Sequence, residues 1–221
     1  MSFLFNKIVD NRQDDSMATI MRRRRFELFL NLLDRVPRPL SILDVGGLPN
    51  FWERMGFTDQ PGIHITLLNI HDEHLAHRHF TAMIGDATDM SNIADQAFDV
   101  VFSNSVIEHV GCFAQQRKMA QEVQRVGKRY FLQTPNYCFP IEPHFLFPGF
   151  QWLPLWTRTF LITHFNLGWV KRISDPEEAR TLVETTRLLR RRELHELFPT
   201  AELYEERLFH LTKSFVVYEH W

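Results

Sequence analysis

The sequence predicts a doubly wound α/β fold, a mostly parallel sheet with helices on both faces. From residue 40 onward, short apolar runs alternate with helical patterns, as strands joined by crossover helices do. Near the carboxyl end, two further apolar runs are joined by a short polar link, which predicts an antiparallel pair. The length of 221 residues suits one domain with a substantial core.

The first expected element is a helix from about Ser16 to Asp34. Its apolar face consists of Met21, Phe26, Phe29, Leu30 and Leu33. The run Arg22–Arg25 lies within it, and four consecutive side chains fan around most of a helix. We therefore predict a solvated helix surface here, not a basic patch for nucleic acid or anionic lipid.

Strands and helices then follow in order. The expected strands are 40–47, 63–70, 80–88, 98–107, 128–136, 201–209 and 213–220. The expected helices are 50–57, 114–127 and one from about Pro176 to Phe198. The first of these begins with Asn50 and Glu53, whose spacing is that of a capping box.

The amino-acid composition narrows the classes of protein and partner that this chain suits. Hydrophobic residues make up 44% and charged residues 24% of the chain, and 25 basic against 27 acidic side chains give a net charge of −2. This balance is typical of a soluble globular protein and does not favour a nucleic-acid partner. Cys112 and Cys138 form no CxxC pair, residues 1–15 lack the apolar core of a signal peptide, and no apolar run is long enough to span a membrane. We therefore expect a cytoplasmic location.

Polar residues and glycines recur at the carboxyl ends of the expected strands. They are Asp44, Gly46 and Gly47 at the first strand, Asn69 at the second, Asp86 beside Ala87 at the third, Asn104 and Ser105 at the fourth, and Thr134 and Asn136 at the fifth. The carboxyl ends of parallel strands share one edge, where ligands bind in open sheets. A single polar residue at a strand end is often only a turn former, but the whole set predicts a pocket.

The glycine turn does not suit a phosphate. A dinucleotide site needs G-x-G-x-x-G and an acidic residue after the second strand. Here Gly46 and Gly47 are adjacent, a third glycine is missing, Pro49 has no N–H to donate, and Asn69 stands where the acid is expected. A P-loop is excluded because no Gly-Lys-Ser/Thr follows.

The order of these motifs resembles that of the class I S-adenosylmethionine-dependent methyltransferases. The resemblance runs from 42–47 through 67–70, 85–88 and 98–110 to 129–136, and includes the late hairpin 207–220. It implies a seven-stranded sheet whose last strand is antiparallel. It also implies that S-adenosylmethionine binds across the ends of the first, second and third strands. Such a cofactor has no phosphate, which agrees with the departures of the glycine turn.

The resemblance also implies the roles of individual residues. Asp44, Gly46 and Gly47 would lie beside the amino-acid part of the cofactor, and Asn69 would bond the ribose hydroxyls with one acceptor and one donor. Asp86 would bond the adenine amino group, and the backbone N–H of Ala87 would bond the ring. Asn104 and Ser105 would lie near the methionine part and the sulfonium.

Methyl transfer needs a base only when the acceptor must lose a proton. The candidates are Glu142 and His144, two residues apart between prolines after the fifth expected strand, with His109 and Glu108 after the fourth. The alternative for His144 is a structural hydrogen bond, and Glu108 and His109 also suit the lining of the cofactor pocket. No metal site is expected, because the histidines lack HxxxH spacing and the cysteines do not group with them.

Residues 137–169 form an aromatic and proline-broken segment that is far longer than a usual strand-to-helix connection. We favour a lid over the active site. A dimer interface and an interfacial segment that contacts a membrane are the alternatives.

We therefore predict one methyltransferase domain over 1–221. Its parts are a helical extension 1–38, a cofactor-binding core 39–137, an aromatic insert 138–175, and 176–221 with the last helix and the antiparallel pair. The predicted reaction is methylation of a small or medium-sized organic acceptor at oxygen, by a monomer or homodimer. The alternatives are a silent methyltransferase-like binding module and an NAD(P)-dependent Rossmann enzyme. Which acceptor is used stays open.

Overall fold

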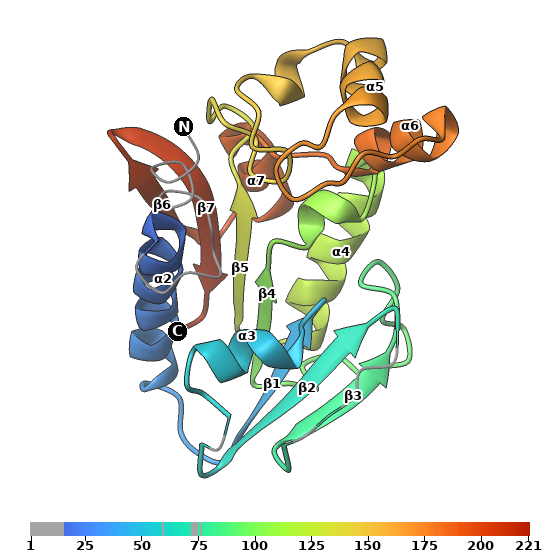
Figure 1. Ribbon diagram of the computed structural model, residues 1–221. Helices are drawn as coiled ribbons and strands as arrows, with labels where there is room; N and C mark the ends of the chain where they lie inside the picture. The colour runs from blue at the N-terminus through green and yellow to red at the C-terminus, as the bar shows by residue number, and fades with distance from the viewer. Residues whose placement is uncertain (1–15, 59, 72–74, 76) are drawn as a thin grey trace.

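The protein is described from a computed structural model that covers residues 16–58, 60–71, 75 and 77–221. Its sheet has seven strands: β1 Leu40–Val45, β2 Ile63–Asn69, β3 Phe80–Ile84, β4 Val100–Asn104, β5 Tyr130–Pro135, β6 Glu202–Leu208 and β7 Leu211–Glu219. The order is β3-β2-β1-β4-β5-β7-β6, and β7 alone runs opposite to the other strands. The predicted fold class is confirmed (Figure 1).

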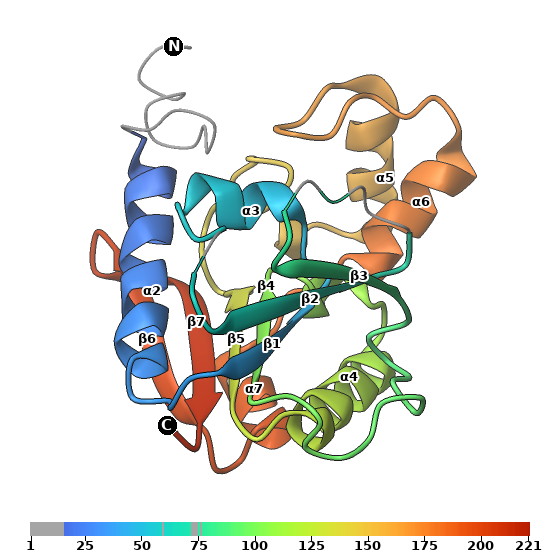
Figure 2. The same ribbon diagram turned by 90° about the horizontal axis from the view of Figure 1, so that it is seen from below.

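Helices cover both faces of the sheet. The helices of the described residues are α2 Met17–Leu33, α3 Pro49–Arg54, η1 Ile107–His109, α4 Phe113–Val126, η2 Phe150–Trp152, α5 Leu155–His164, α6 Pro176–Thr185 and α7 Arg191–Leu197. One core packs α4 and α7 on the sheet, and the other packs α2 and α3 on the opposite face (Figure 2). Among the described residues, no helix combines the length and apolarity that crossing a bilayer requires.

The core under α2 is aromatic. Phe29 lies edge-on to Phe102 and Phe131, which stack with an interplanar angle of 4°. Trp52 of α3 is fully buried beside the same cluster. Such tilted and offset rings pack favourably and resist sliding, so the strand ends next to α3 are held firmly.

The insert has a small core of its own. Phe145, Phe150 and Ile162 pack against Ala179 and Val183 of α6. In Figure 1 this unit lies beyond the ends toward which β4 and β5 point. It therefore stands over the carboxyl edge of the sheet, on the β4–β5 side.

Two local predictions are wrong. The helix predicted over 176–198 is divided into α6 and α7, because Leu188 and Leu189 are buried in the core and Leu189 forms a bridge with Asn136. A continuous helix would not deliver both leucines to that position. The capping box at Asn50 is absent, since α3 begins with Pro49 as its first residue and Leu48 as its cap.

Candidate functional site

The glycine turn after β1 leaves no room for side chains. Gly46 has φ +74°, and a Cβ there would lie 2.6 Å from a methyl group of Val106. A Cβ at Gly47 would lie 2.1 Å from Oδ2 of Asp44. Both positions therefore need glycine, the first for its backbone conformation and its space, the second for space alone.

Asp44 supports this turn from below. Its side chain is buried, and its Oδ2 accepts a hydrogen bond of 2.7 Å from the indole Nε1 of Trp52. Burial raises the pKa of Asp44 to about 7, although the Trp52 bond opposes the shift. In this conformation the carboxylate fixes the loop to Trp52 of α3. The sequence analysis instead predicts that Asp44 contacts the cofactor directly.

Asn69 connects the end of β2 to the same turn. Its Nδ2 donates to the carbonyl oxygen of Gly47 over 3.4 Å, and its Oδ1 accepts from the backbone N–H of Ile70 over 2.8 Å. A carboxylate at this position would have no proton to donate to Gly47. The amide of Asn69 therefore connects the end of β2 to the turn after β1, a connection that an acidic side chain could not make.

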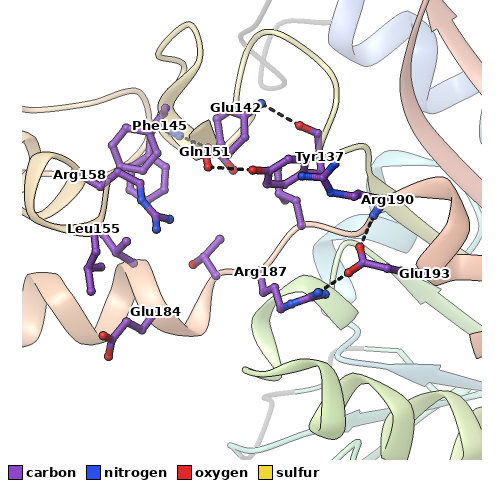
Figure 3. Close-up of a pocket in the computed structure, with 14 residues that line it drawn as sticks. Tyr137, Glu142, Phe145, Gln151, Leu155, Arg158, Glu184, Arg187, Arg190 and Glu193 are labelled. Atoms are coloured by element: carbon purple, nitrogen blue, oxygen red, sulfur yellow. Dashed lines mark hydrogen bonds and ion pairs between the residues drawn. The ribbon is translucent and has the colours of Figure 1, made fainter. Parts of the chain in front are cut away.

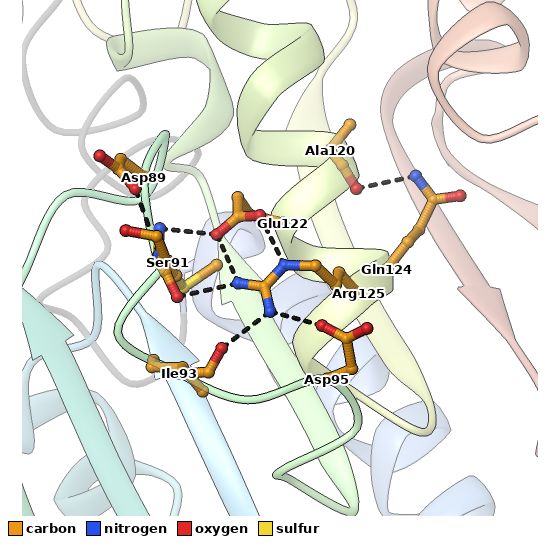
Figure 4. A network of polar contacts seen from close by, with 9 residues as sticks. Asp89, Ser91, Ile93, Asp95, Ala120, Glu122, Gln124 and Arg125 are labelled. Carbon is orange, nitrogen blue, oxygen red and sulfur yellow. Dashed lines mark hydrogen bonds and ion pairs between the residues drawn. The ribbon is translucent and has the colours of Figure 1, made fainter.

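The loop after β3 is anchored by a polar network. Asp86 accepts from the N–H and the hydroxyl of Thr88 at 2.7 and 2.8 Å, which closes a turn. Farther along, Arg125 of α4 bonds the carbonyl oxygens of Met90 and Ile93 and the carboxylates of Glu122 and Asp95 (Figure 4). Asp86 and Ala87 are thus presented by a loop whose far end is fixed to α4.

Two residues at the end of β4 have unusual surroundings. Ser105 has φ +58°, a conformation that costs a non-glycine residue about 1 kcal/mol or more. It is held by hydrogen bonds of its N–H and its hydroxyl to Gln133 at 3.0 and 2.7 Å. The Oδ1 of Asn104 is buried without a hydrogen-bond partner among the described residues. An acceptor of this kind fits the N–H donors of a ligand.

A carboxylate and a histidine of the insert form a closely bonded pair. The Nδ1 of His144 lies 2.6 Å from Oε1 of Glu142. The other carboxylate oxygen accepts the backbone N–H groups of His144 and Phe145, both at 2.7 Å. Burial lowers the pKa of His144. The hydrogen bond to Glu142 and the negative charges of Glu142 and Glu108 act in the opposite direction and outweigh burial, so the pKa is raised overall.

Two residues of η1 approach this pair. Glu108 is buried, accepts a hydrogen bond of 3.1 Å from Thr134, and keeps its Oε1 without a partner. Burial raises the pKa of Glu108 to about 7. The ring of His109 lies edge-on to that of His144 at 4.6 Å. Part of the His109 ring meets solvent, yet desolvation by its neighbours and the charge of His144 lower its pKa.

Comparison with known proteins relates this chain to methyltransferases. The sequence model of the family described as "Methyltransferase domain" matches residues 52–130. The CurJ carbon methyltransferase shares the fold with a TM-score of 0.57 at 12% identity, over 93% of this chain and 55% of that one. A SAM-dependent methyltransferase from Methanosarcina mazei aligns with a TM-score of 0.50 at 15% identity, over 85% of this chain and 94% of that one.

The family match over residues 52–130 and the shared fold support a class I methyltransferase. A 58-residue segment is also 40% identical to the uncharacterized protein Rv1509 of Mycobacterium tuberculosis and covers 26% of this chain and 20% of that relative. The chain thus matches about a fifth of the length of this curated relative.

The family match supports S-adenosylmethionine as the cofactor. The described residues fit it, because Asn104 at the end of β4 offers a buried acceptor that has no hydrogen-bond partner among them. The individual contacts of Asp44, Asn69, Asp86 and Ala87 with the cofactor stay predictions. Glu108, His109 and His144 bring one ligand atom each within 4.8 Å of one another, a spacing that a metal ion could also use.

Two cavities adjoin the His144–Glu142 pair of the methyltransferase. The larger, about 440 Å³, lies between the insert and the segment from α6 to α7. Figure 3 shows Glu142 at its edge, with Arg158, Arg187 and Arg190 around it. Its lining balances the arginines with Glu142, Glu184 and Glu193. Arg187 bonds Glu193, and Arg190 stacks on the ring of Tyr137 at 4.2 Å.

The second cavity, about 300 Å³, opens at the end of β4 and contains His144. Its lining comprises residues of α2, β4, β5, the insert and the β6–β7 hairpin: Met17, Ala18, Met21, Arg22, Arg25, Asn104, Ser105, Gln133, Pro135, Phe139, Ile141, Pro143, His144, Leu146, Trp169, Leu208, Lys213 and Ser214. It contains the predicted residues nearest to the sulfonium, Asn104 and Ser105. The smaller cavity is therefore the better candidate for the acceptor.

The basic run of α2 is only partly a solvated surface. Arg23 and Arg24 are exposed, as predicted, but Arg22 and Arg25 line the second cavity. Residues three apart share one side of a helix. Arg22 and Arg25 therefore point to the same side of α2, toward the cavity, and Arg23 and Arg24 point to solvent. Sequence reasoning missed Arg22 and Arg25 because it treated the four arginines as equivalent, and it missed Lys213 because nothing local distinguishes that residue.

Proposed function

We propose that this methyltransferase methylates a hydroxyl oxygen of a small organic acceptor, with His144 as the general base. The single observation that carries the proposal is the Glu142–His144 pair, bonded at 2.6 Å, at a cavity that also contains Asn104 and Ser105. A base is needed for a hydroxyl acceptor, and a histidine oriented by a carboxylate is well suited to the task. The carbon acceptor of CurJ belongs to that protein and does not decide the atom used here.

Each residue then has a defined part. Glu142 keeps a proton on Nδ1 of His144, so that Nε2 has the lone pair that takes the acceptor's hydroxyl proton. Asn104, Ser105 and the glycine turn orient the cofactor, which supplies an activated methyl group on a sulfonium. Once the reactants are aligned, their orientation provides much of the rate enhancement. Glu108 and His109 surround the base and limit its access to water.

The insert supports the proposed role of a lid. Phe139, Ile141, Leu146 and Trp169 wall the second cavity, which excludes water from the reacting atoms. Trp156, Phe160 and Phe165 are exposed elsewhere on the insert, and a monomer or a homodimer agrees with them. We further propose a cytoplasmic location, which is supported by the free and exposed thiols of Cys112 and Cys138.

Two measurements test the proposal. Calorimetry with S-adenosylmethionine should show saturable binding, whereas NADH should not bind. A screen for S-adenosylhomocysteine release should then give turnover with hydroxyl acceptors and not with their methyl ethers. Cofactor binding without turnover on any acceptor would favour a silent binding module. Failure to bind the cofactor would refute the enzyme assignment altogether.

A further inference from the structure

Three cationic side chains meet in the second cavity. Arg22 and Arg25 come from one side of α2, and Lys213 comes from β7. Figures 1 and 2 both show α2 beside the β6–β7 hairpin, away from the helices of the insert. The cations thus occupy the side of the cavity formed by α2 and the hairpin, whereas His144 comes from the insert.

Only one of these charges is paired within the described part of the chain. The carboxylate of Glu206 lies 3.5 Å from Nη1 of Arg25 and also accepts a hydrogen bond from the hydroxyl of Ser214. No hydrogen bond or ion pair joins the side chain of Arg22 or Lys213 to any described residue. One acid thus faces three cations, and the side chains of both partners in the Arg25–Glu206 pair are almost fully buried.

The surroundings make this excess of charge costly. Burial, then the charges of Arg25 and Arg54, lower the pKa of Arg22 to about 10, although Glu206 opposes the shift. Burial also lowers the pKa of Lys213, as do Arg25 and Arg22, again against Glu206. Charged groups removed from water without partners are strongly destabilising. A bound anion would supply the missing negative charge.

We propose that the methyl acceptor is an organic anion, and that Arg22 and Lys213 bind its carboxylate or phosphate group. The inference rests on the proposed function, because it assigns the second cavity to the acceptor. The apolar lining from Met21, Ile141 and Trp169 holds the body of such a molecule. Its hydroxyl then faces His144, while its anionic group lies among the cations. A guanidinium matches either anion with two parallel hydrogen bonds.

The first cavity does not suit this part. Arg187 is bonded there to Glu193 and Gln116. Its lining contains as many glutamates as arginines, and no strand end of the cofactor side lines it. The two cavities differ in charge compensation, and only the second has a clear excess of positive charge.

The test uses the full chain, with and without saturating S-adenosylhomocysteine, at one fixed ionic strength. The probes are benzoate, phenyl phosphate and uncharged benzamide, titrated by calorimetry. We expect benzoate or phenyl phosphate to bind, and benzamide to bind at least about tenfold more weakly. The preferred anion distinguishes a carboxylate acceptor from a phosphate acceptor.

Variants locate the binding. Arg22→Met and Lys213→Met should each weaken the binding of the preferred anion by about 10- to 100-fold, while their affinity for S-adenosylhomocysteine stays that of the wild type. Arg24→Gln is the matched control, since it removes an exposed charge from the same run. It should change neither affinity. Thermal unfolding of each variant shows whether it is folded.

The outcomes separate the two proposals. If S-adenosylhomocysteine binds but benzamide equals benzoate, or Arg22→Met behaves like Arg24→Gln, the anion proposal is wrong and the methyltransferase assignment stands. If Arg22→Met only lowers the unfolding temperature and the wild type binds no anion, the cations serve folding and the proposal is overturned. If anions bind but S-adenosylhomocysteine does not, the cation site stands and its assignment to a methyl acceptor fails.

Discussion

At the ends of β1, β2 and β3, polar side chains are bonded to the protein itself, whereas around the ends of β4, β5 and β7 charged side chains face a cavity. Asp44 is bonded to Trp52, Asn69 to the glycine turn, and Asp86 to Thr88. On the other side, Arg22 and Lys213 have no partner among the described residues. The first half is a finished scaffold for a cofactor of fixed structure, and the second is completed by a ligand.

This contrast predicts that substitutions in the two halves fail differently. Changes around the glycine turn should impair folding and cofactor affinity together, because the polar groups there stabilise the loop. Changes around the cavity should impair turnover or acceptor affinity and leave the fold intact.

The largest effect is expected for His144→Ala, which removes the proposed base. Turnover with a hydroxyl acceptor should fall by about 100- to 10,000-fold, while the affinity for S-adenosylmethionine stays unchanged. Initial rates of S-adenosylhomocysteine release and calorimetry measure the two quantities. His195→Ala, at an exposed position of α7, is the control. Unchanged turnover in His144→Ala would reduce His144 to a structural residue of the insert.

Gly47→Ala tests the scaffold half. The new Cβ would lie 2.1 Å from the Asp44 carboxylate, so the loop or the carboxylate must move. We expect a loss of about 1–3 kcal/mol in the free energy of unfolding and a weaker affinity for S-adenosylmethionine. Denaturant titration and calorimetry measure these changes.

Gly56→Ala is the control for that substitution. Gly56 has φ +67° but nothing within 4 Å of its added Cβ, so backbone strain should cost about 1–2 kcal/mol and leave cofactor affinity intact. If both variants keep full affinity for the cofactor, the glycine turn is not part of the cofactor site.

The sequence predicted the scaffold half better than the cavity half, for a physical reason. The apolar runs of the strands and the polar residues that end them are local patterns, so Asp44, Asn69 and Asp86 could be placed on one rim before the fold was known. The Glu142–His144 pair was within reach for the same reason, because the two residues are close in the chain.

The cavity half depends on contacts between distant segments. Arg22 and Lys213 meet only because α2 lies beside the β6–β7 hairpin, and no local pattern records that contact. The break between α6 and α7 was missed for a similar reason. Residues 185–189 contain no glycine or proline, and the helix ends there because Leu188 and Leu189 are drawn into the core.

The pH dependence of turnover probes the cavity half further. Since His144 must be neutral to accept a proton, kcat/KM should rise with pH through the raised pKa of His144, by up to about tenfold per pH unit. In Glu142→Gln, the loss of the charge that raises this pKa should move the rise to lower pH. A profile that is flat in the wild type, or identical in Glu142→Gln, would contradict the proposed base.

The smallest effect concerns the carboxylate beneath the glycine turn. The pKa of Asp44 is about 7 in the folded protein against an ordinary value of 3.8, so between these values the folded state binds more protons than the unfolded state. The wild type should therefore lose stability as pH rises from about 4 to about 7, by at most ~1.4 kcal/mol per pH unit from this group. Asp44→Asn keeps an acceptor for Trp52 but does not titrate, so its free energy of unfolding should fall less steeply as the pH rises.

Denaturant titrations at several pH values measure this difference in slope, with Asp34→Asn as the control for losing an exposed carboxylate. Equal slopes in the wild type and Asp44→Asn would show that Asp44 is charged beneath the turn, and the scaffold half would then contain a buried charge of its own, as the cavity half does.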